Sequence, residues 1–441
     1  MPDTHAPLEA RLAAPVAASL GAWAAGATAF PDAARRIAGR AMIDVTGCMI
    51  AGASDGAAVA VRKTIAAWGS GNATVVGQHA TVAVPWAAFA NGTAAHALDF
   101  DDNFDPAKAH ISAVLAPALL ALAESKNLSG RAVIDSYIVG TEIAARLGAM
   151  FNPGHREAGW HATATLGAIA AAGACAHLLR LDASRIAHAL STATSFAGGS
   201  TAQFGTMTKA THAGHAAMAG IMAASLVANG LDAGHHAIEH FARLAHGGDV
   251  ATETHDLALV RHGLKQKLYP CCASAHRAID GVRALCAAHR LLPDDIARID
   301  VHLPASHLAN LMHALPGTPR EARFSLGYCL AIAVRNGTIK LADFAALDAS
   351  LLAFAERVRG DGVDAAEHSF PTRTEIVCTD GRAFAASVDA PKGRAENPLS
   401  DAELWAKFHD CCPQRTHEIS AALSVFDRSI PAAALMTLLR G

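Results

Sequence analysis

The sequence contains a long apolar run, ATATLGAIAAAGAC (Ala162–Cys175), and a second one, AAMAGIMAASLVA (Ala216–Ala228). Both exceed the usual length of a strand, so we interpret them as helices. They are too short and too rich in small residues to span a membrane. Neither carries a polar stripe, and such helices lie in the centre of a bundle with other helices around them. The two runs therefore predict a close-packed helical core.

Helical patterns surround this core and continue almost without interruption to about residue 265. Ser129 and Asp182 stand where helix N-caps are needed, and Asn229 with Gly230 forms a C-cap signal. The predicted helices cover residues 113–124, 130–147, 164–179 and 211–229. The first part of the chain is thus expected to be all-helical.

The pattern changes after Pro270. Ile296–Pro304 alternates as a strand does, and Asp380–Gly381 is a hairpin signal between two strand-like segments, 372–379 and 382–389. Two further helices are predicted, over 324–334 and 344–357. This part therefore predicts an α+β unit of about three antiparallel strands with helices on one face.

The expected fold class is mainly α with a smaller α+β domain. We place the all-helical domain at residues 1–265 and the α+β domain, with its short antiparallel sheet, at 266–395. Residues 396–441 return to helical periodicity and are expected to pack back on the helical domain.

Composition narrows the class of protein. Apolar residues make up 52% of the 441 residues and charged residues 17%, which excludes a disordered chain. The net charge of −3 argues against a nucleic-acid-binding protein, so an anionic substrate must be held by local cations. The nine cysteines are scattered without a CxxC spacing. With no targeting segment recognised, we expect a cytoplasmic protein with reduced cysteines and no membrane attachment.

The densest polar cluster is HALDFDDN (His96–Asn103), which is followed by His110. On a helix, Asp99 would share a face with His96 and Asn103. Three interpretations remain open for this cluster: a solvated helix end whose carboxylates cap backbone amides, a catalytic site, or a divalent metal site.

Four further segments carry candidate residues. His161 opens the first apolar run, where the helix dipole disfavours its protonation and favours a bound anion. Lys209 lies on a helix expected to be buried, so its ammonium either reaches solvent or meets an anion. Lys267 lies at the domain junction, a preferred place for ligands. Tyr328 either donates a proton or packs in the core. For each of them, a purely structural role is the alternative.

Together these segments resemble the MmgE/PrpD family, which is named for 2-methylcitrate dehydratase. HALDFDD with the following His110, GWHATATLG, GTMTKATHAG, KLYPCC and RFSLGY occur in the family's order and spacing. Asn103 stands where relatives often have threonine, and His110 lies one residue later than in the family's pattern. Alanine at 162 and isoleucine at 111 replace prolines that are common after the two histidines.

The resemblance implies a homodimer of a large helical domain, built from both chain ends, and a smaller α+β lid. It further implies a site between the domains that binds a small polycarboxylate without metal or organic cofactor. The catalytic residues it implies are Asp99, His110, His161, Lys209 and Tyr328. Asn103, Lys267, His212 and Arg323 complete the set as substrate-binding residues.

The chemistry implied by the family is making or breaking a C–H bond next to a carboxylate. The two lysines would hold carboxylates, His161 or His110 would act as the base, and Asp99 would orient a histidine or lysine. Dehydration of a 2-methylcitrate-like acid is the leading expectation. Epimerisation of an iminodisuccinate-like acid and decarboxylation of a cis-aconitate-like acid are the alternatives. From other classes, a non-catalytic carboxylate-binding protein and a metal-dependent hydrolase remain rivals.

Overall fold

The computed structural model describes residues 15–248, 256–365, 370–428 and 430–441, and the chain divides into two compact units. Unit 1 comprises Met1–Lys265 and Cys411–Gly441, and unit 2 comprises Gln266–Asp410. The sequence analysis had placed the first domain boundary after residue 265 as well. The second boundary lies at residue 411 rather than 396, because helix α18 (Asp401–Cys411) belongs with unit 2. Asp410 of this helix accepts a hydrogen bond from the Leu341 backbone N–H, and Glu403 forms an ion pair with Lys392.

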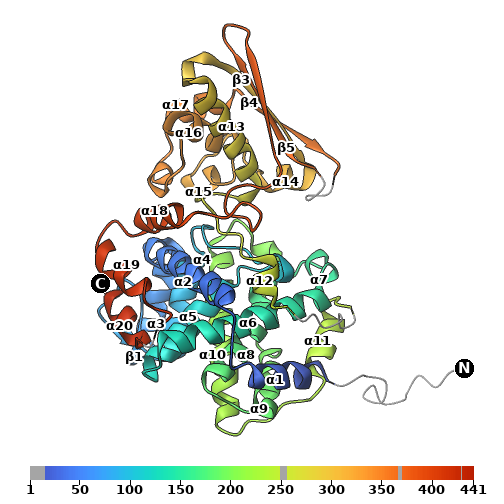
Figure 1. Cartoon of the computed structure of the whole chain (residues 1–441), viewed down its shortest axis with the longest axis vertical. Coiled ribbons are helices and arrows are strands. Elements are labelled where there is room, and N and C mark those ends of the chain that lie inside the picture. Colours follow the sequence, from blue (N-terminus) through green and yellow to red (C-terminus); the bar gives the residue numbers. More distant parts are fainter. Residues whose placement is uncertain (1–14, 249–255, 366–369, 429) are drawn as a thin grey trace, which may run out of the picture. The chain divides into compact units, whose positions relative to one another are not determined.

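Unit 1 is a helical bundle with one short two-stranded ribbon (Figure 1). Its ribbon strands are β1 (Ser70–Thr74) and β2 (Thr81–Val82). Its helices are α1 (Val16–Gly26), α2 (Asp32–Gly52), α3 (Gly56–Ala66), α4 (Val84–His96), α5 (Ser112–Ser125), α6 (Gly130–Phe151), α7 (Gly154–Glu157), α8 (Ala162–Leu178), α9 (Ala183–Ala193), α10 (Met207–Ala228), α11 (Ala237–Leu244), α12 (Ala258–His262), α19 (Thr416–Leu423) and α20 (Ala432–Leu438).

The two apolar runs form α8 and much of α10, as predicted. Every residue of α8 except His177 is buried, so this helix has no solvent face. Small side chains let α10 approach it closely. A Cβ added at Gly220 would lie 2.4 Å from the Cβ of Ala171, closer than carbon atoms pack. The absence of a polar stripe in the two apolar runs therefore correctly predicted that they pack inside the helical bundle.

The predicted helix ends are confirmed. The Ser129 side chain accepts a hydrogen bond from the Ala132 N–H at 3.3 Å, and Asp182 accepts one from the Arg185 N–H at 2.9 Å. Gly230, one residue after the C-cap of α10, has a φ of 98°, a conformation that side-chain-bearing residues rarely adopt.

The C-terminal segment completes unit 1. The Ala432 N–H donates to the Leu128 carbonyl at 2.8 Å, and the Gly130 N–H donates to the Ile430 carbonyl at 2.7 Å. Near the end of the chain, the Arg440 guanidinium lies 3.2 Å from a carboxylate oxygen of the buried Glu124. These contacts join the last helices to the α5–α6 connection, as expected for a domain built from both ends.

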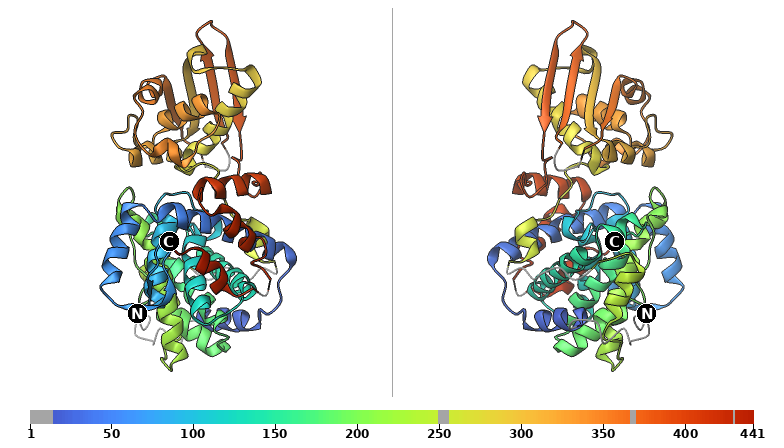
Figure 2. Two further views of the ribbon diagram at one scale, coloured as in Figure 1. Left: turned by 90° about the vertical axis from the view of Figure 1, so that its left-hand side faces the viewer. Right: turned by 90° about the vertical axis from the view of Figure 1, so that its right-hand side faces the viewer.

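Unit 2 is an α+β unit, as expected, and Figure 2 shows helices gathered on one face of its sheet. Its strands are β3 (Ile296–Pro304), β4 (Val358–Val363), β5 (Thr372–Cys378) and β6 (Ala383–Val388). Its helices are α13 (His276–His289), α14 (Ala305–Asn310), α15 (Pro319–Ala322), α16 (Leu326–Asn336), α17 (Ala349–Ala355) and α18. Burial alternates along β5, so one face of the sheet is packed and the other is solvated.

The sheet differs from the expectation in the number and in the direction of its strands. Its order is β4-β3-β5-β6, and β4 pairs parallel to β3, so the sheet is mixed rather than antiparallel. The predicted hairpin around Asp380–Gly381 is confirmed by the antiparallel β5–β6 pairing. Strand β4, with the sequence VRGDGV, was not predicted because glycine and aspartate are depleted in strands.

No helix within the described residues is both long enough and apolar enough to cross a membrane.

Candidate functional site

The loop that follows α4 carries three carboxylates, those of Asp99, Asp101 and Asp102. Helix α4 ends at His96, and Asp99 has a φ of 53°. The cluster therefore does not form the helix on which Asp99 was expected to share a face with His96 and Asn103. Aspartate adopts this left-handed conformation more readily than most residues. The loop is also not solvated, because Asp101 and Asp102 are 0% and 1% exposed. Burial on this scale excludes the interpretation of a merely capping surface loop.

Asp101 lies between two histidines. Its Oδ2 is 2.8 Å from His96 Nδ1 and 3.2 Å from His110 Nδ1. Burial raises the pKa of Asp101, but the charge interactions and hydrogen bonds with the two imidazoles outweigh it and hold the pKa well below its ordinary value. The carboxylate is therefore ionised at neutral pH, inside the protein.

His96 is an uncharged partner of that carboxylate. Burial lowers its pKa to about 4, although Asp101 acts in the opposite direction. A neutral imidazole facing an ionised carboxylate must carry its proton on the facing nitrogen, so we assign the Nδ1–H tautomer. Its ring lies 4.5 Å from that of His110 and 5.9 Å from that of His161, measured between centroids. Three histidine rings thus lie next to one another, and two of them contact the Asp101 carboxylate.

The Lys209 ammonium pairs with an anion, which is one of the two environments that the sequence predicted for it. It lies in the first turn of α10, and its Nζ is 2.6 Å from Asp99 Oδ1. Both side chains are 15% exposed, so the ion pair is partly accessible. The ammonium also lies 5.5 Å from the centre of the Phe204 ring. Asp99 therefore orients a lysine, one of the two roles expected for it.

His161 and His212 form a second pair. Their Nδ1 atoms are 2.9 Å apart, so one ring donates and the other accepts. His161 is the N-cap residue of α8, and burial, followed by electrostatic interactions with the neighbouring histidines and Lys209, holds its pKa well below the ordinary value. The His161 backbone N–H donates to Gly199, where a Cβ would lie 3.3 Å from the His212 ring. A larger residue at 199 would crowd this pair.

Asn103 takes part through its backbone. Its N–H and carbonyl exchange hydrogen bonds with those of Lys265, at 3.0 Å and 2.9 Å. The structure thus brings Asp99, His110, His161, Lys209 and His212 together in unit 1, with Asn103 at the end of the same loop.

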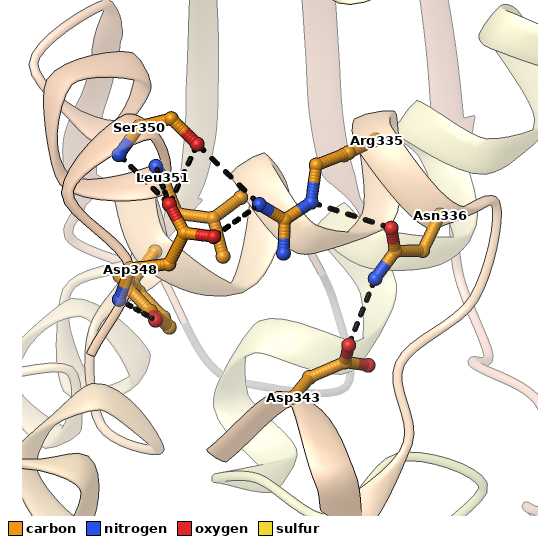
Figure 3. A network of polar contacts seen from close by, with 7 residues as sticks. Arg335, Asn336, Asp343, Asp348, Ser350 and Leu351 are labelled. Atoms are coloured by element: carbon orange, nitrogen blue, oxygen red, sulfur yellow. Dashed lines mark hydrogen bonds and ion pairs between the residues drawn. The ribbon is translucent and has the colours of Figure 1, made fainter. Parts of the chain in front are cut away.

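The remaining predicted residues belong to unit 2. Lys267 is 5% exposed, and Arg323 stacks over Phe344 with its guanidinium carbon 5.4 Å from the ring centre. Tyr328, in α16, is fully buried, and its hydroxyl accepts a hydrogen bond from the Asp348 N–H at 3.0 Å. Figure 3 shows that Asp348 also caps α17 and binds Arg335. This network favours the packing role that the sequence left open for Tyr328.

Two residues that the sequence analysis did not select belong to the cluster, His96 and Asp101. The signal was present, because both lie within HALDFDD. Their importance depends on burial and on the His110 ring, neither of which local sequence shows. Among the described residues, His96, Asp101 and His110 also form a group that could hold a metal ion, with ligand atoms within 4.8 Å of one another. Their mutual hydrogen-bond and ion-pair distances account for the same arrangement without an ion.

The assembled groups are suited to moving protons next to a negative charge. Neutral imidazoles can accept or deliver protons, and a partly accessible ammonium can stabilise charge that develops on a carboxylate.

Comparison with known proteins agrees with this picture. The model of the MmgE/PrpD N-terminal domain matches residues 18–247, and that of the MmgE/PrpD C-terminal domain matches 269–428. The chain is 28% identical to the cis-aconitate decarboxylase of Homo sapiens over 73% of this chain and 71% of the relative. It is 26% identical to the Mus musculus enzyme of the same name over 73% and 70%, respectively. It is also 26% identical to the cis-aconitate decarboxylase-like protein oryM of Aspergillus oryzae, over 84% of this chain and 85% of that protein.

Proposed function

The chain belongs to the MmgE/PrpD family, and we propose that it decarboxylates a small unsaturated tricarboxylic acid of the cis-aconitate type. The observation that carries the proposal is the cluster of neutral histidines beside the Lys209–Asp99 pair, in a chain whose relatives carry that activity in their names. The relatives favour decarboxylation over the dehydration of 2-methylcitrate that led the sequence-based expectations.

The proposed reaction breaks one C–C bond and forms one C–H bond. A substrate carboxylate leaves as carbon dioxide, and its bonding electron pair stays on carbon, where the neighbouring double bond and carboxylate delocalise it. The Lys209 ammonium stabilises this charge, and Asp99 holds the ammonium in place through the 2.6 Å contact. A histidine of the cluster then delivers a proton to carbon, so the tricarboxylate and one proton yield a dicarboxylate and carbon dioxide.

Each group has a distinct part in this scheme. His161 and His110 are the candidates for proton transfer, and the 2.9 Å contact between the Nδ1 atoms of His161 and His212 couples the tautomers of these two rings. Lys267 is our candidate for holding a second substrate carboxylate.

The test is NMR of the EDTA-treated protein in deuterated water with cis-aconitate, 2-methylcitrate, citrate, iminodisuccinate and malate in turn. We expect cis-aconitate to lose carbon dioxide and to gain one deuterium per product molecule. Conversion of 2-methylcitrate without reaction of cis-aconitate would contradict the proposal and restore dehydration. Exchange of iminodisuccinate alone would favour epimerisation, and activity that requires added metal would favour the His96–Asp101–His110 metal group.

A further inference from the structure

The feature that carries a further inference is Asp101, which the reaction scheme above does not use. It is fully buried, and it contacts two histidines through one oxygen, Oδ2, while Oδ1 has no hydrogen-bond partner within the described part of the chain. A buried carboxylate with an unsatisfied oxygen costs stability, so its retention needs a reason.

We propose that Asp101 is a positioning residue, which fixes the ring and the tautomer of His110, while His96 fixes Asp101 from the other side. The proposal rests on His110 acting in the proposed reaction. His110 Nδ1 lies 3.2 Å from Asp101 Oδ2 in an ion-pair contact that is not aligned as a hydrogen bond. The nearby negative charge favours a proton on Nδ1, so Nε2 becomes the nitrogen that exchanges protons.

His96 suits the second role because of its surroundings. It donates to Asp101 at 2.8 Å, its side chain is 0% exposed, and its Nε2 has no partner within the described residues. Since His96 is neutral, it does not cancel the charge of Asp101, and the negative charge remains available to His110. A lysine or arginine in its place would neutralise the carboxylate.

The remaining neighbours of His110 do not supply this negative charge. The titratable groups around its ring are Asp101 from its own loop, His96 from α4 and His161 from the start of α8. The hydroxyl of Thr163, in α8, accepts a hydrogen bond from the His110 backbone N–H at 3.0 Å. Lys209 of α10 adds positive charge near His96 and His161. Among these groups, Asp101 is the one anion, so its removal has a defined electrostatic sign.

Asp101→Asn tests the proposal, with Asp105→Asn as the control because Asp105 lies in the same loop and pairs with Lys265 instead. We expect a loss of kcat of about 100-fold with little change in KM for Asp101→Asn, and no comparable loss for Asp105→Asn. A folded Asp101→Asn protein with unchanged kcat would overturn the proposal.

A second measurement needs neither substrate nor the variant's activity. Nitrogen-15 NMR of the wild-type histidine rings, assigned with a His110→Asn protein, should show protonated Nδ1 on both His96 and His110 at neutral pH. Protonation of His110 on Nε2 alone would refute the inference. Because this readout needs no turnover, it separates failure of the inference from failure of the proposed reaction.

Discussion

The close approach of α8 and α10 at Gly220 should be necessary both for stability and for the histidine pair. In Gly220→Ala, the new Cβ would lie 2.4 Å from the Ala171 Cβ, 2.7 Å from its carbonyl carbon and 2.9 Å from the Ala172 nitrogen. Carbon atoms pack at about 3.5–4.0 Å, so the helices must part by roughly 1 Å. Two of the three atoms belong to backbone and cannot turn aside.

The magnitude follows from two opposing effects. Overpacking a buried contact costs about 1–3 kcal/mol, whereas replacing a helical glycine by alanine gains about 1 kcal/mol. We expect Gly220→Ala to lower the free energy of unfolding by up to about 2 kcal/mol. Gly39→Ala is the matched control, because Gly39 also lies inside a helix and a Cβ there meets nothing within 4 Å. That substitution should stabilise the protein by about 0.5–1 kcal/mol.

The assay is urea unfolding followed by tryptophan fluorescence, which reports mainly on unit 1 because four of the five tryptophans lie there. The parting of the helices should also lengthen the His161–His212 contact, so kcat for the proposed reaction should fall in Gly220→Ala and not in Gly39→Ala. If both variants gained stability equally, the close approach of the helices would not restrict the size of the side chain at position 220, and the reasoning would be refuted.

Three other predictions concern charge. Lys209→Met should lower kcat for the proposed reaction by about 100-fold or more, because the ammonium that stabilises developing negative charge is lost. The control Lys126→Met, at an exposed lysine, should leave kcat unchanged. Equal kcat values in the two proteins would contradict this prediction. Burial lowers the pKa of His96 from 6.5 to about 4, so the unfolded chain binds this proton at higher pH than the folded chain does. The free energy of unfolding should therefore fall by up to about 3 kcal/mol as the pH is lowered from about 6.5 to 4. Urea unfolding at several pH values should therefore show a shallower pH dependence in His96→Gln than in the wild type, and identical dependence would count against it. Lys267→Met should raise KM more than it lowers kcat if the lysine holds a substrate carboxylate, and steady-state kinetics with an unchanged KM would remove Lys267 from the site.

Local chemistry predicted most of the secondary structure. The buried α8 follows from its composition, the start of α9 from Asp182, and the β5–β6 hairpin from Asp380–Gly381. Strand β4 could not be predicted in the same way. Its residues are mostly exposed and poor strand formers, and its pairing with β3 depends on the chain between them folding first.

The candidate site was predictable where a residue's own neighbours in sequence decide its environment. His161 at the start of a very apolar helix and Lys209 on a buried one were both identified in this way. Asp101 was not, because its role depends on the ring of His110, nine residues away across a non-helical loop. The fully buried hydroxyl of Tyr328 likewise depends on Asp348, which is distant in sequence.

The division of unit 1 between the two ends of the chain has a consequence for how the protein folds during synthesis. Unit 2 is continuous, so all of its residues have left the ribosome once Asp410 has emerged. Unit 1 begins first but finishes last, because the α5–α6 connection obtains its hydrogen bonds from Ile430 and Ala432. Until these two residues have emerged, the larger unit therefore exposes unpaired backbone groups and apolar helix faces, which are the features that chaperones bind and that promote aggregation.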